Sequence, residues 1–388
     1  MIYNRNHLKI HIVRLLMRLF YFFPVKNDKV FFSSYEGKQF SCNPKYVYLK
    51  LRHLNEELDY IYEYNDSGNV PIELENATIV KHNSIMYFFH VLTAKVIVSN
   101  NAMNPKLPIR HSQYVINTWH GGGAFKRVGI DIDSKVNGLD GKLLKITADQ
   151  TSLFLASSKG FYEGTGKGSC IPYDKVLFVG MPRNDVLFCN PNEREIINRK
   201  VRDYYGISQS DKLLLYAPTF RGGIGFVERI KGEHLKWTEV KRSLGKRFGG
   251  EWKLVFRGHY HSTIGIDDVS VLIDASDYPD SQELLIASDA VITDYSSMIW
   301  DYSLTEKPGF LFCPDLNNYL NERNFYSPIE SWPYHYAENN HDLCDIIEKY
   351  SEEDNRNRCT DYHLTMGSYE DGFASLAIAE VVKNHLCK

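Results

Sequence analysis

The sequence predicts an α/β protein of two domains, and three observations support this fold class. The chain has 388 residues, more than a single hydrophobic core usually organises. Short apolar segments alternate with helical stretches along it, as in parallel sheets covered by helices on both faces. The polar stretch 190–195 separates two series of such segments, so we place the domain boundary at 189/190.

The predicted strands are short, apolar and bounded by polar or glycine-rich turns. The first series comprises Lys29–Ser33, Leu58–Tyr62, Ala77–Val80, Lys95–Ser99, Tyr114–Trp119, Leu153–Ala156 and Lys175–Val179. The second series comprises Leu213–Tyr216, Lys253–Phe256, Val269–Ile273, Ala290–Thr293 and Phe310–Phe312. Two α/β domains of similar size are expected to bind ligands in the crevice between them.

Composition argues against several classes of protein. Hydrophobic residues make up 43% of the chain and charged residues 24%, which is typical of a globular protein. Nucleic-acid binders are usually strongly basic, whereas the formal net charge here is -3. The 7 cysteines are far apart and none has CxxC spacing, which argues against a disulfide framework or a zinc site.

The first 28 residues contain the one candidate targeting segment. Helical spacing in residues 7–23 places His7, His11, Arg14 and Arg18 on one face, and apolar residues cover much of the rest. The run is shorter than the roughly 20 uncharged residues of a membrane-spanning helix. It fits a basic amphipathic helix that lies on an anionic membrane. The alternative is a helix packed on the first domain with its basic face in water.

One reactive side chain stands where a predicted strand ends, the edge at which open α/β sheets bind ligands. The strand before it delivers His120 to this edge, and three glycines follow at 121–123. A histidine there can serve as a general base near neutral pH. Glycine lets the backbone approach a ligand closely and exposes N–H groups to anions. The alternative is a capping histidine beside a flexible turn.

Cationic side chains follow two strands of the second series. Arg221 ends the turn after one strand, and Arg257, His259 and His261 follow another at alternate positions. Converging cationic donors without carboxylates suggest a phosphate site. The alternatives are a strand-end turn with its arginine in water and a solvated polar loop.

The segment 293–297 leaves a predicted strand and opens a helix that runs to Leu304. Free N–H groups at a helix start bind anions, and Ser296 and Ser297 add hydroxyl donors. The alternative is that Asp294 or Ser296 only caps the helix.

Two weaker patterns are discounted. The first is Asp131 with Asp133 as a metal site, and the second is Gly164–Gly168, which we interpret as a flexible turn.

Taken together and in order, these segments resemble the CDP-glycerol glycerophosphotransferase family of teichoic-acid and capsule synthesis. The similarity covers about Val30 to the C-terminus. The matching elements are Trp119-His120-Gly121 with Lys126 and Gly129, Gly180–Asp185, Ala217–Arg221, Arg257–His259, Thr293–Ser297 with Asp301, and Asp371–Ser375. The chain departs from the family at Gly122-Gly123, where Thr-Pro or similar is usual, so its acceptor stays open.

The resemblance implies a GT-B-like fold, with two Rossmann-like domains facing across a cleft. Residues 1–28 would be the basic amphipathic membrane helix, 29–189 the acceptor domain and 190–388 the CDP-alditol-binding domain. The implied catalytic residues are His120 and His259. The implied substrate-binding residues are Arg221, Arg257, Thr293, Asp294, Ser296, Ser297, Asp301 and Lys126. Neither a metal nor another cofactor is implied.

The resemblance also implies a reaction: glycerol phosphate moves from CDP-glycerol to a hydroxyl of a lipid-linked or polymeric cell-surface precursor, and CMP leaves. His120 would accept the hydroxyl proton, and protein cations would neutralise the developing charge. The enzyme would be peripheral, at the cytoplasmic face of the cell membrane, with no nucleic-acid partner. Three alternatives stay open: a CDP-ribitol ribitolphosphotransferase, a GT-B glycosyltransferase that uses a nucleotide sugar, and a membrane-surface scaffold without activity.

Overall fold

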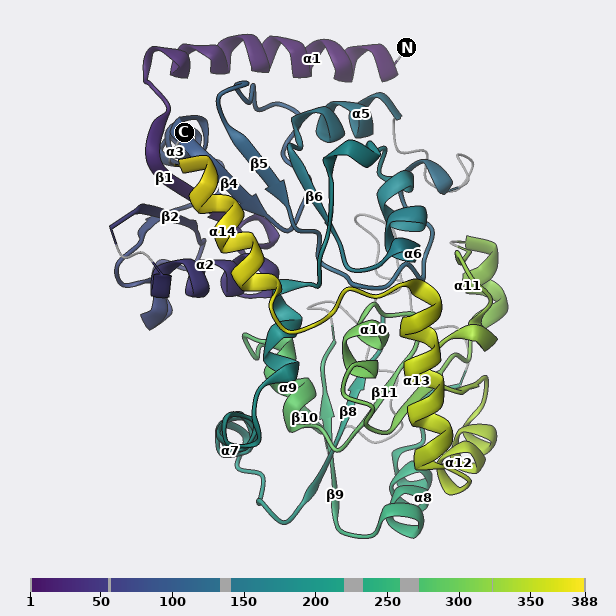
Figure 1. Ribbon diagram of the computed structural model, residues 1–388. Helices are drawn as coiled ribbons and strands as arrows, with labels where there is room; N and C mark the ends of the chain where they lie inside the picture. Colours follow the sequence, from purple (N-terminus) through teal and green to yellow (C-terminus); the bar gives the residue numbers. More distant parts are fainter. Residues whose placement is uncertain are drawn as a thin grey trace. The chain divides into compact units, whose positions relative to one another are not determined.

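The structure is a computed structural model that describes residues 2–54, 57–132, 141–219, 233–258, 272–322 and 324–386. It divides into two compact units. Unit 1 comprises Met1–His120, Val128–Asp185 and Tyr369–Lys388, and unit 2 comprises Gly121–Arg127 and Val186–Ser368. Each unit is built on a parallel sheet flanked by helices, which confirms the predicted fold class of two Rossmann-like α/β domains (Figure 1).

Unit 1 has a seven-stranded sheet in the order β3-β2-β1-β4-β5-β6-β7, in which all neighbours are parallel. The strands are β1 (Lys26–Ser33), β2 (Asp59–Glu63), β3 (Thr78–Val80), β4 (Ala94–Ser99), β5 (Tyr114–Asn117), β6 (Leu153–Ala156) and β7 (Val176–Phe178). Its helices include α2 (Cys42–Leu54), α3 (Ile85–Thr93), α5 (Gly141–Gln150), α6 (Lys159–Phe161) and α14 (Ala374–Leu386).

Alternate residues of β1 face opposite sides of this sheet, as the two-residue period of a strand requires. Val30 and Phe32 join one core with residues of α2 and α14, whereas Phe31 joins a second core with residues of α3. Because both faces are covered, the strand can be apolar at consecutive positions. This explains why continuous apolar runs predicted the strands of unit 1.

Unit 2 has a six-stranded sheet in the order β10-β9-β8-β11-β12-β13, again with parallel neighbours. The strands are β8 (Lys212–Ala217), β9 (Trp252–Phe256), β10 (Leu272–Asp274), β11 (Ala290–Thr293), β12 (Gly309–Phe312) and β13 (Tyr336–Ala337). The helices include α7 (Pro191–Tyr205), α8 (Trp237–Phe248), α9 (Ser281–Ala287), α10 (Met298–Ser303), α11 (Leu316–Glu322), α12 (Asn340–Glu348) and α13 (Glu352–Met366).

Helix α7 occupies the polar stretch that we interpreted as the linker between domains. The Asn190 side chain accepts the Glu193 N–H at 3.0 Å, and the Glu193 carboxylate accepts the Asn190 N–H at 3.3 Å. Pro191 fills the first helical position, where its missing N–H costs nothing. The helix ends at Gly206, whose φ of 63° suits glycine. The stretch 190–195 is polar because it is the exposed start of a helix.

Two chain segments belong to a different unit from the residues next to them in the sequence. Helix α14 follows all of unit 2 in the chain, yet its Ile378 and Val382 lie in a core of unit 1. The segment Gly121–Arg127 follows β5 of unit 1, yet it belongs to unit 2. Its Phe125 is 2% exposed, and the ring centroid lies 4.7 Å from that of Trp332. The predicted domain bounds 29–189 and 190–388 did not include this exchange, although the sequence led us to expect that the last helix, about Ala374 to His385, packs back across the domain junction.

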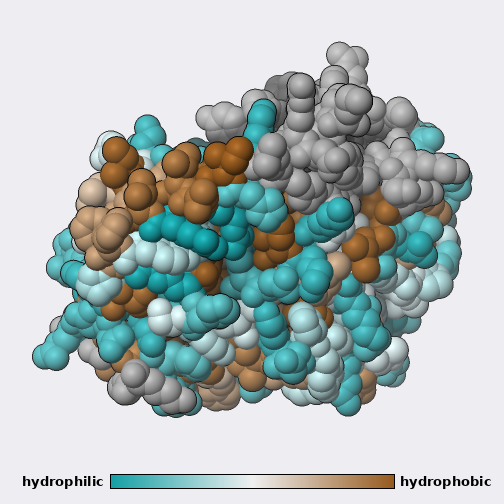
Figure 2. Space-filling view, turned by 90° about the horizontal axis from the view of Figure 1, so that it is seen from above, coloured by the Kyte–Doolittle hydropathy of each residue, from teal (hydrophilic) through white to brown (hydrophobic). Residues whose placement is uncertain are grey.

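The N-terminal helix α1 (Ile2–Met17) continues into a 3₁₀ turn, η1 (Arg18–Phe22). Arg14 Nη1 donates to the Pro105 carbonyl at 2.9 Å, so this basic side chain faces the body of unit 1. Apolar residues face outward instead: Leu15 is 65% exposed, Leu16 60% and Leu19 64%. Figure 2 shows hydrophobic side chains gathered on the face that carries α1. Within the described ranges, no helix has the length and apolar character needed to cross a bilayer.

The glycine run after His120 has a packing role at its second position. A Cβ built on Gly122 would lie 2.1 Å from Cδ1 of Trp300, a fully buried side chain of α10. Real carbon atoms never approach so closely, so only glycine fits here without a shift of the indole. We had expected these glycines to let the backbone approach a ligand. At Gly122 the close neighbour is a tryptophan of unit 2.

We expect Gly122→Ala to lower the free energy of unfolding by about 1–3 kcal/mol, because Trp300 must move in a packed core. Gly245→Ala is the matched control, since Gly245 lies inside α8 and its Cβ would meet open space. Alanine there should stabilise the helix by about 1 kcal/mol. Urea unfolding followed by circular dichroism measures both changes. Equal stability of the two variants would contradict this account of Gly122.

Candidate active site

The carboxyl edge of the unit 1 sheet gathers the residues that follow β1, β4 and β5. These strands are neighbours, and their register pairs Ser33 with Ser99 and Ser99 with Asn117. The segments that leave the three strands therefore start side by side. They carry Tyr35 after β1, Asn100 after β4 and His120 after β5. The structure thus places His120 at the strand edge where the sequence predicted it.

The imidazole of His120 is oriented by a backbone carbonyl. Its Nδ1 lies 3.0 Å from the carbonyl oxygen of Asn100, which can only accept a hydrogen bond. Nδ1 therefore carries the proton in the neutral ring, and the lone pair is on Nε2. The ring stacks on Trp119 with centroids 5.0 Å apart and lies 5.9 Å from the Tyr35 ring. A half-buried histidine with this tautomer is suited to accept a proton at Nε2.

Backbone strain is concentrated around this histidine. Within the described ranges, eight residues other than glycine have a positive φ, and four of them belong to the loops at this edge. These four are Tyr35 (49°), Glu36 (58°), Cys42 (59°) and Trp119 (54°). Such conformations cost of order 1–3 kcal/mol each and persist only where surrounding contacts enforce them. Clustered strain of this kind is typical of functional sites.

Sequence reasoning missed several polar residues at the same edge. The Asn100 side chain accepts the Tyr35 N–H at 2.9 Å and so ties the loop after β1 to the loop after β4. Glu63 ends β2, is 1% exposed and hydrogen-bonds to His82. Burial raises the pKa of the Glu63 carboxyl, and its hydrogen bonds oppose that rise. One signal could have found these residues: each polar side chain ends or follows an apolar strand.

The carboxyl edge of the unit 2 sheet carries the second predicted group. Strands β9, β8 and β11 are neighbours there. The Asp294 carboxylate, 2% exposed, accepts the N–H of Thr219 at 2.8 and 3.0 Å and the N–H of Tyr295 at 2.5 Å. Thr293 Oγ1 donates to the Ala217 carbonyl at 2.7 Å. Both side chains fasten the turn after β8 to the turn after β11.

The two predicted serines precede a helix that is shorter than expected. Ser296 Oγ accepts the N–H of Met298, the first residue of α10, at 3.2 Å, whereas the N-cap residue Ser297 makes no capping hydrogen bond with its side chain. Helix α10 spans only Met298–Ser303, and its dipole is correspondingly small. Ser296 and Ser297 are half-buried, whereas Asp294 and Tyr295 before them are buried. Within the described part of this edge, Ser296 and Ser297 therefore offer hydroxyl groups rather than the N-terminus of a long helix.

Two other predicted residues hold backbone or side chains in place. Asp301 is 4% exposed, and its Oδ2 accepts a hydrogen bond from Gln282 Nε2 at 2.9 Å. Arg257 Nη1 donates to the carbonyls of Ala275 and Tyr278 at 3.1 and 2.8 Å. Both contacts lie within unit 2.

The remaining predicted residues either lie outside the described part of the chain or contact other segments. Arg221, His259, His261 and Asp133 lie outside the described residues. Lys126 belongs to unit 2, where it pairs with Phe325 in an isolated antiparallel bridge. Within the described part of the chain, no three His, Cys, Asp or Glu side chains gather as a metal site would require.

The segment Gly164–Gly168, which we interpreted as a flexible turn, is helical. Tyr162–Gly166 forms a π-helical turn that directly continues α6, and residues 167–168 extend it. A Cβ on Gly166 would lie 2.5 Å from Cδ2 of Tyr162, so this glycine is also a packing residue. The glycines therefore fit a π-helical turn rather than a phosphate loop.

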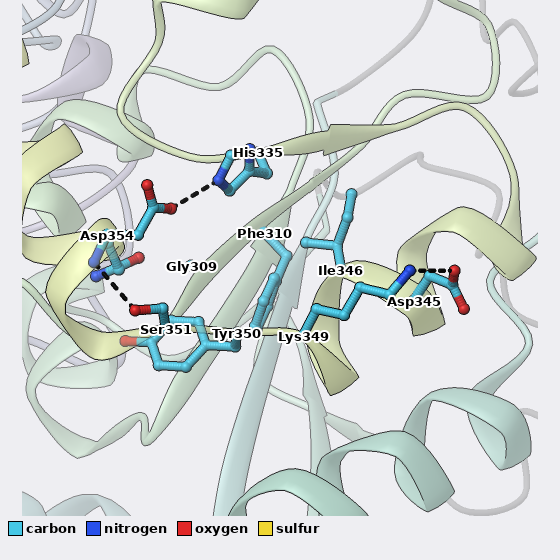
Figure 3. A pocket seen from close by; sticks show the side chains of 10 residues that line it. Gly309, Phe310, His335, Asp345, Ile346, Lys349, Tyr350, Ser351 and Asp354 are labelled. Atoms are coloured by element: carbon cyan, nitrogen blue, oxygen red, sulfur yellow. Dashed lines mark hydrogen bonds and ion pairs between the residues drawn. The ribbon is translucent and has the colours of Figure 1, made fainter.

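A cavity of about 400 Å³ in unit 2 lies away from the predicted site. Gly309 at its wall begins β12, so the cavity opens at the amino edge of the sheet. Figure 3 shows its polar wall, where His335 bonds to Asp354 and Lys349 to Asp345. Because open α/β sheets bind their ligands at the carboxyl edge, this cavity does not define the active site.

Comparison with known proteins identifies the family. The family model for CDP-glycerol:poly(glycerophosphate) glycerophosphotransferase matches residues 15–384. The teichoic acid ribitol-phosphate primase of Bacillus spizizenii is 29% identical over 373 residues, 94% of this chain and 92% of the relative. The teichoic acid glycerol-phosphate transferase of Staphylococcus aureus is 27% identical over 384 residues, 96% of this chain and 97% of the relative. The chain spans 51% of the Staphylococcus epidermidis teichoic acid poly(glycerol phosphate) polymerase, at 29% identity.

Solved structures agree with this result. A structure of the wall teichoic acid polymerase TagF superposes with a TM-score of 0.82 and 25% identity, covering 99% of this chain and 97% of that one. The Staphylococcus aureus MnaA-UDP structure, at 12% identity and a TM-score of 0.51, shares the fold alone. Since the family model matches nearly the whole chain, this protein belongs to the CDP-glycerol:poly(glycerophosphate) glycerophosphotransferase family.

Proposed function

We propose that the chain transfers glycerol phosphate from CDP-glycerol to a hydroxyl group of a teichoic acid precursor and releases CMP. Family membership over residues 15–384 supports the reaction. Similarity over nearly the full length of a teichoic acid glycerol-phosphate transferase supports the acceptor class. Other cell-surface polymers, such as capsule, are acceptors of the same chemical kind.

His120 is the proposed general base. The acceptor oxygen forms a bond to the β-phosphorus of CDP-glycerol, and the bond from that phosphorus to the bridging oxygen breaks. CMP leaves with the electron pair, and the hydroxyl proton passes to Nε2 of His120. The observation that carries this role is the hydrogen bond from Nδ1 to the Asn100 carbonyl, which puts the lone pair on Nε2. Positioning and charge neutralisation supply most of the catalysis in such a transfer.

The proposed donor contacts belong to unit 2. Ser296 and Ser297 are the half-buried hydroxyl donors of its carboxyl edge, and they would bind the pyrophosphate. Arg221 and His259 would neutralise its charge, and Lys126 is a further proposed substrate contact. The bonds of Asp294, Thr293, Asp301 and Arg257 within unit 2 support a positioning role for these four residues.

CDP-ribitol is the second candidate donor. One observation favours it: the ribitol-phosphate primase of Bacillus spizizenii matches this chain over 92% of its own length. Glycerol and ribitol phosphates share the phosphoryl chemistry and differ only in the length of the alditol. The same base and the same pyrophosphate contacts would serve either donor.

The donor is tested by calorimetric titration of the purified chain with CDP-glycerol, CDP-ribitol and a UDP-sugar. We expect CDP-glycerol to bind at least about tenfold more tightly than the UDP-sugar, a difference of about 1.4 kcal/mol. Tighter binding of CDP-ribitol would establish the second candidate. Preference for the UDP-sugar would contradict the proposal and indicate glycosyl transfer.

The base is tested by substitution. His120→Ala should lower kcat on the order of 100-fold or more, because no group then accepts the hydroxyl proton. Its dissociation constant for CDP-glycerol should stay within about twofold, since the pyrophosphate contacts lie in unit 2. His53→Ala, at an exposed position of α2 in the same unit, is the control and should keep its rate. A His120→Ala enzyme with a rate close to that of the control would refute the assignment.

We further propose that α1 and η1 hold the enzyme on the cytoplasmic face of the cell membrane. The apolar side chains of Leu15, Leu16 and Leu19 face outward, and exposed Lys9 and Arg18 flank them. An apolar stripe with basic edges suits the surface of an anionic bilayer. The opposite side of the segment contacts unit 1 through Arg14 and Tyr21, so these leucines stay available to a membrane.

Leu16→Glu combined with Leu19→Glu should abolish sedimentation with phosphatidylglycerol liposomes, since two carboxylates would enter the headgroup region. Leu364→Glu is the control, because Leu364 is a leucine of α13 with 73% exposure. It should sediment like the unmodified chain, and none of the proteins should sediment with phosphatidylcholine liposomes. Unchanged binding of the double variant to phosphatidylglycerol would rule out the α1 anchor.

A further inference from the structure

The backbone that delivers His120 is held by one buried amide. Asn43, the second residue of α2, is 0% exposed. Its Nδ2 donates to the carbonyl oxygens of Thr118 and Trp119, each at 3.0 Å. These are the two residues directly before His120. Both hydrogens of the amide therefore fix the turn that ends in the proposed base.

The oxygen of the same amide engages a segment that has no role so far. Asn43 Oδ1 accepts the N–H of Arg183 at 3.1 Å. Arg183 lies in Gly180–Asp185, one of the motifs that carried the family resemblance, and it is 3% exposed. This motif supplies none of the proposed base or donor contacts. Its contact in this structure is with Asn43, and Asn43 in turn binds the turn before His120.

A second motif anchors the first one. Glu370 accepts the N–H of Met181 at 3.0 Å and a hydrogen of the Asn184 amide at 2.9 Å. The Asp185 carboxylate accepts the N–H groups of Ala374 and Ser375 at 3.0 and 2.7 Å. Glu370 and the first turn of α14 are thereby fastened to Gly180–Asp185, and α14 itself packs on α2 within unit 1 (Figure 1).

The His120 turn needs such support because its backbone is strained. Trp119 has a φ of 54°, a conformation that side chains other than glycine rarely adopt. Without Asn43 the buried Thr118 carbonyl would lose its amide donor, and the partly buried Trp119 carbonyl would keep only the Thr118 hydroxyl at 3.2 Å. A buried polar group without its partner costs about 1–3 kcal/mol. The turn would then relax, and the imidazole would move with it.

We propose that Asn43 is a positioning residue for His120, and that Gly180–Asp185 and the segment that leads into α14 form the buried bracket that holds Asn43. The inference rests on the proposed role of His120 as base. The backbone carbonyl of Asn100 sets the tautomer of the His120 ring, whereas the Asn43 side chain sets the position of the backbone that carries the ring. Misplacement of a catalytic group by about 1 Å can cost on the order of 100-fold in rate.

Gln113 provides a matched control in the same unit. Its Nε2 donates to the carbonyls of Val91 and Ala94, each at 2.8 Å, and its Oε1 accepts the Arg110 N–H at 3.1 Å. It is 5% exposed and directly precedes β5, the strand whose other end leads to His120. Gln113→Ala thus removes the same pattern of hydrogen bonds without touching the turn.

We expect Asn43→Ala to lower kcat by about 10- to 100-fold, with KM for CDP-glycerol within about twofold. Gln113→Ala should lose similar stability in urea unfolding and keep its kcat. Asn43→Ser, which is too short to reach both carbonyls, should also lose kcat and serves if the alanine variant does not fold. A folded Asn43 variant with the kcat of Gln113→Ala would overturn the proposal.

A double substitution separates this inference from the function on which it rests. Residues that act as a unit are not additive, so Asn43→Ala should cause no further loss in the His120→Ala background. A full additional loss would show that Asn43 acts elsewhere. If His120→Ala alone keeps its rate, the assignment of the base fails. If His120→Ala is inactive while Asn43→Ala is fully active, only the positioning role fails.

Discussion

In-register parallel pairing of β4 with β1 and β5 brings the ends of three strands together, and the His120 site depends on it. Parallel strands share a carboxyl edge, so the loops that leave them meet regardless of their distance in the sequence. The carbonyl of Asn100 can reach the imidazole of His120 because the two strands end side by side. A different register between β4 and β5 would move the Asn100 carbonyl away from the His120 imidazole, even though the apolar residues of both strands would be unchanged.

Buried polar side chains complete what strand pairing begins. Asn43 in unit 1 and Asp294 in unit 2 bind backbone groups of two different loops at their own carboxyl edges. Each is nearly inaccessible to water, so its hydrogen bonds face little competition from solvent. The same feature makes each residue costly to replace, since its partners are buried as well. Rigid edges of this kind suit phosphoryl transfer, which relies on positioning more than on covalent chemistry.

Elements that depend on a local sequence pattern could be predicted from the sequence. Features that depend on packing between distant segments could not. Most predicted strands lie close to their observed bounds, although β1 begins at Lys26 rather than Lys29. Positions 269–271 of the predicted strand Val269–Ile273 lie outside the described residues. Strand β13 has two residues, and no pattern could reveal it. The polar start of α7 looked like a linker because capping residues and loop residues are the same types. Nothing local places Phe125 in the core of unit 2.

The candidate site was predicted to a similar extent. His120 and the serines before α10 were found because they follow apolar strands. The partner of His120 could not be found, since a backbone carbonyl contributes the bond and the residue type at Asn100 does not reveal it. Arg257 and Asp301 were recognised as motif residues, but only the structure shows their bonds to the Ala275 carbonyl and Gln282.

The left-handed backbone at Trp119 has a consequence for engineering this enzyme. Glycine adopts such a φ without steric cost, so Trp119→Gly would relieve strain in the folded chain. It would also remove the indole that stacks on the His120 ring and loosen the turn. Relief of the backbone strain and loss of the ring contacts with His120 and Phe154 therefore act in opposite directions. At this position the native side chain represents a compromise between the two.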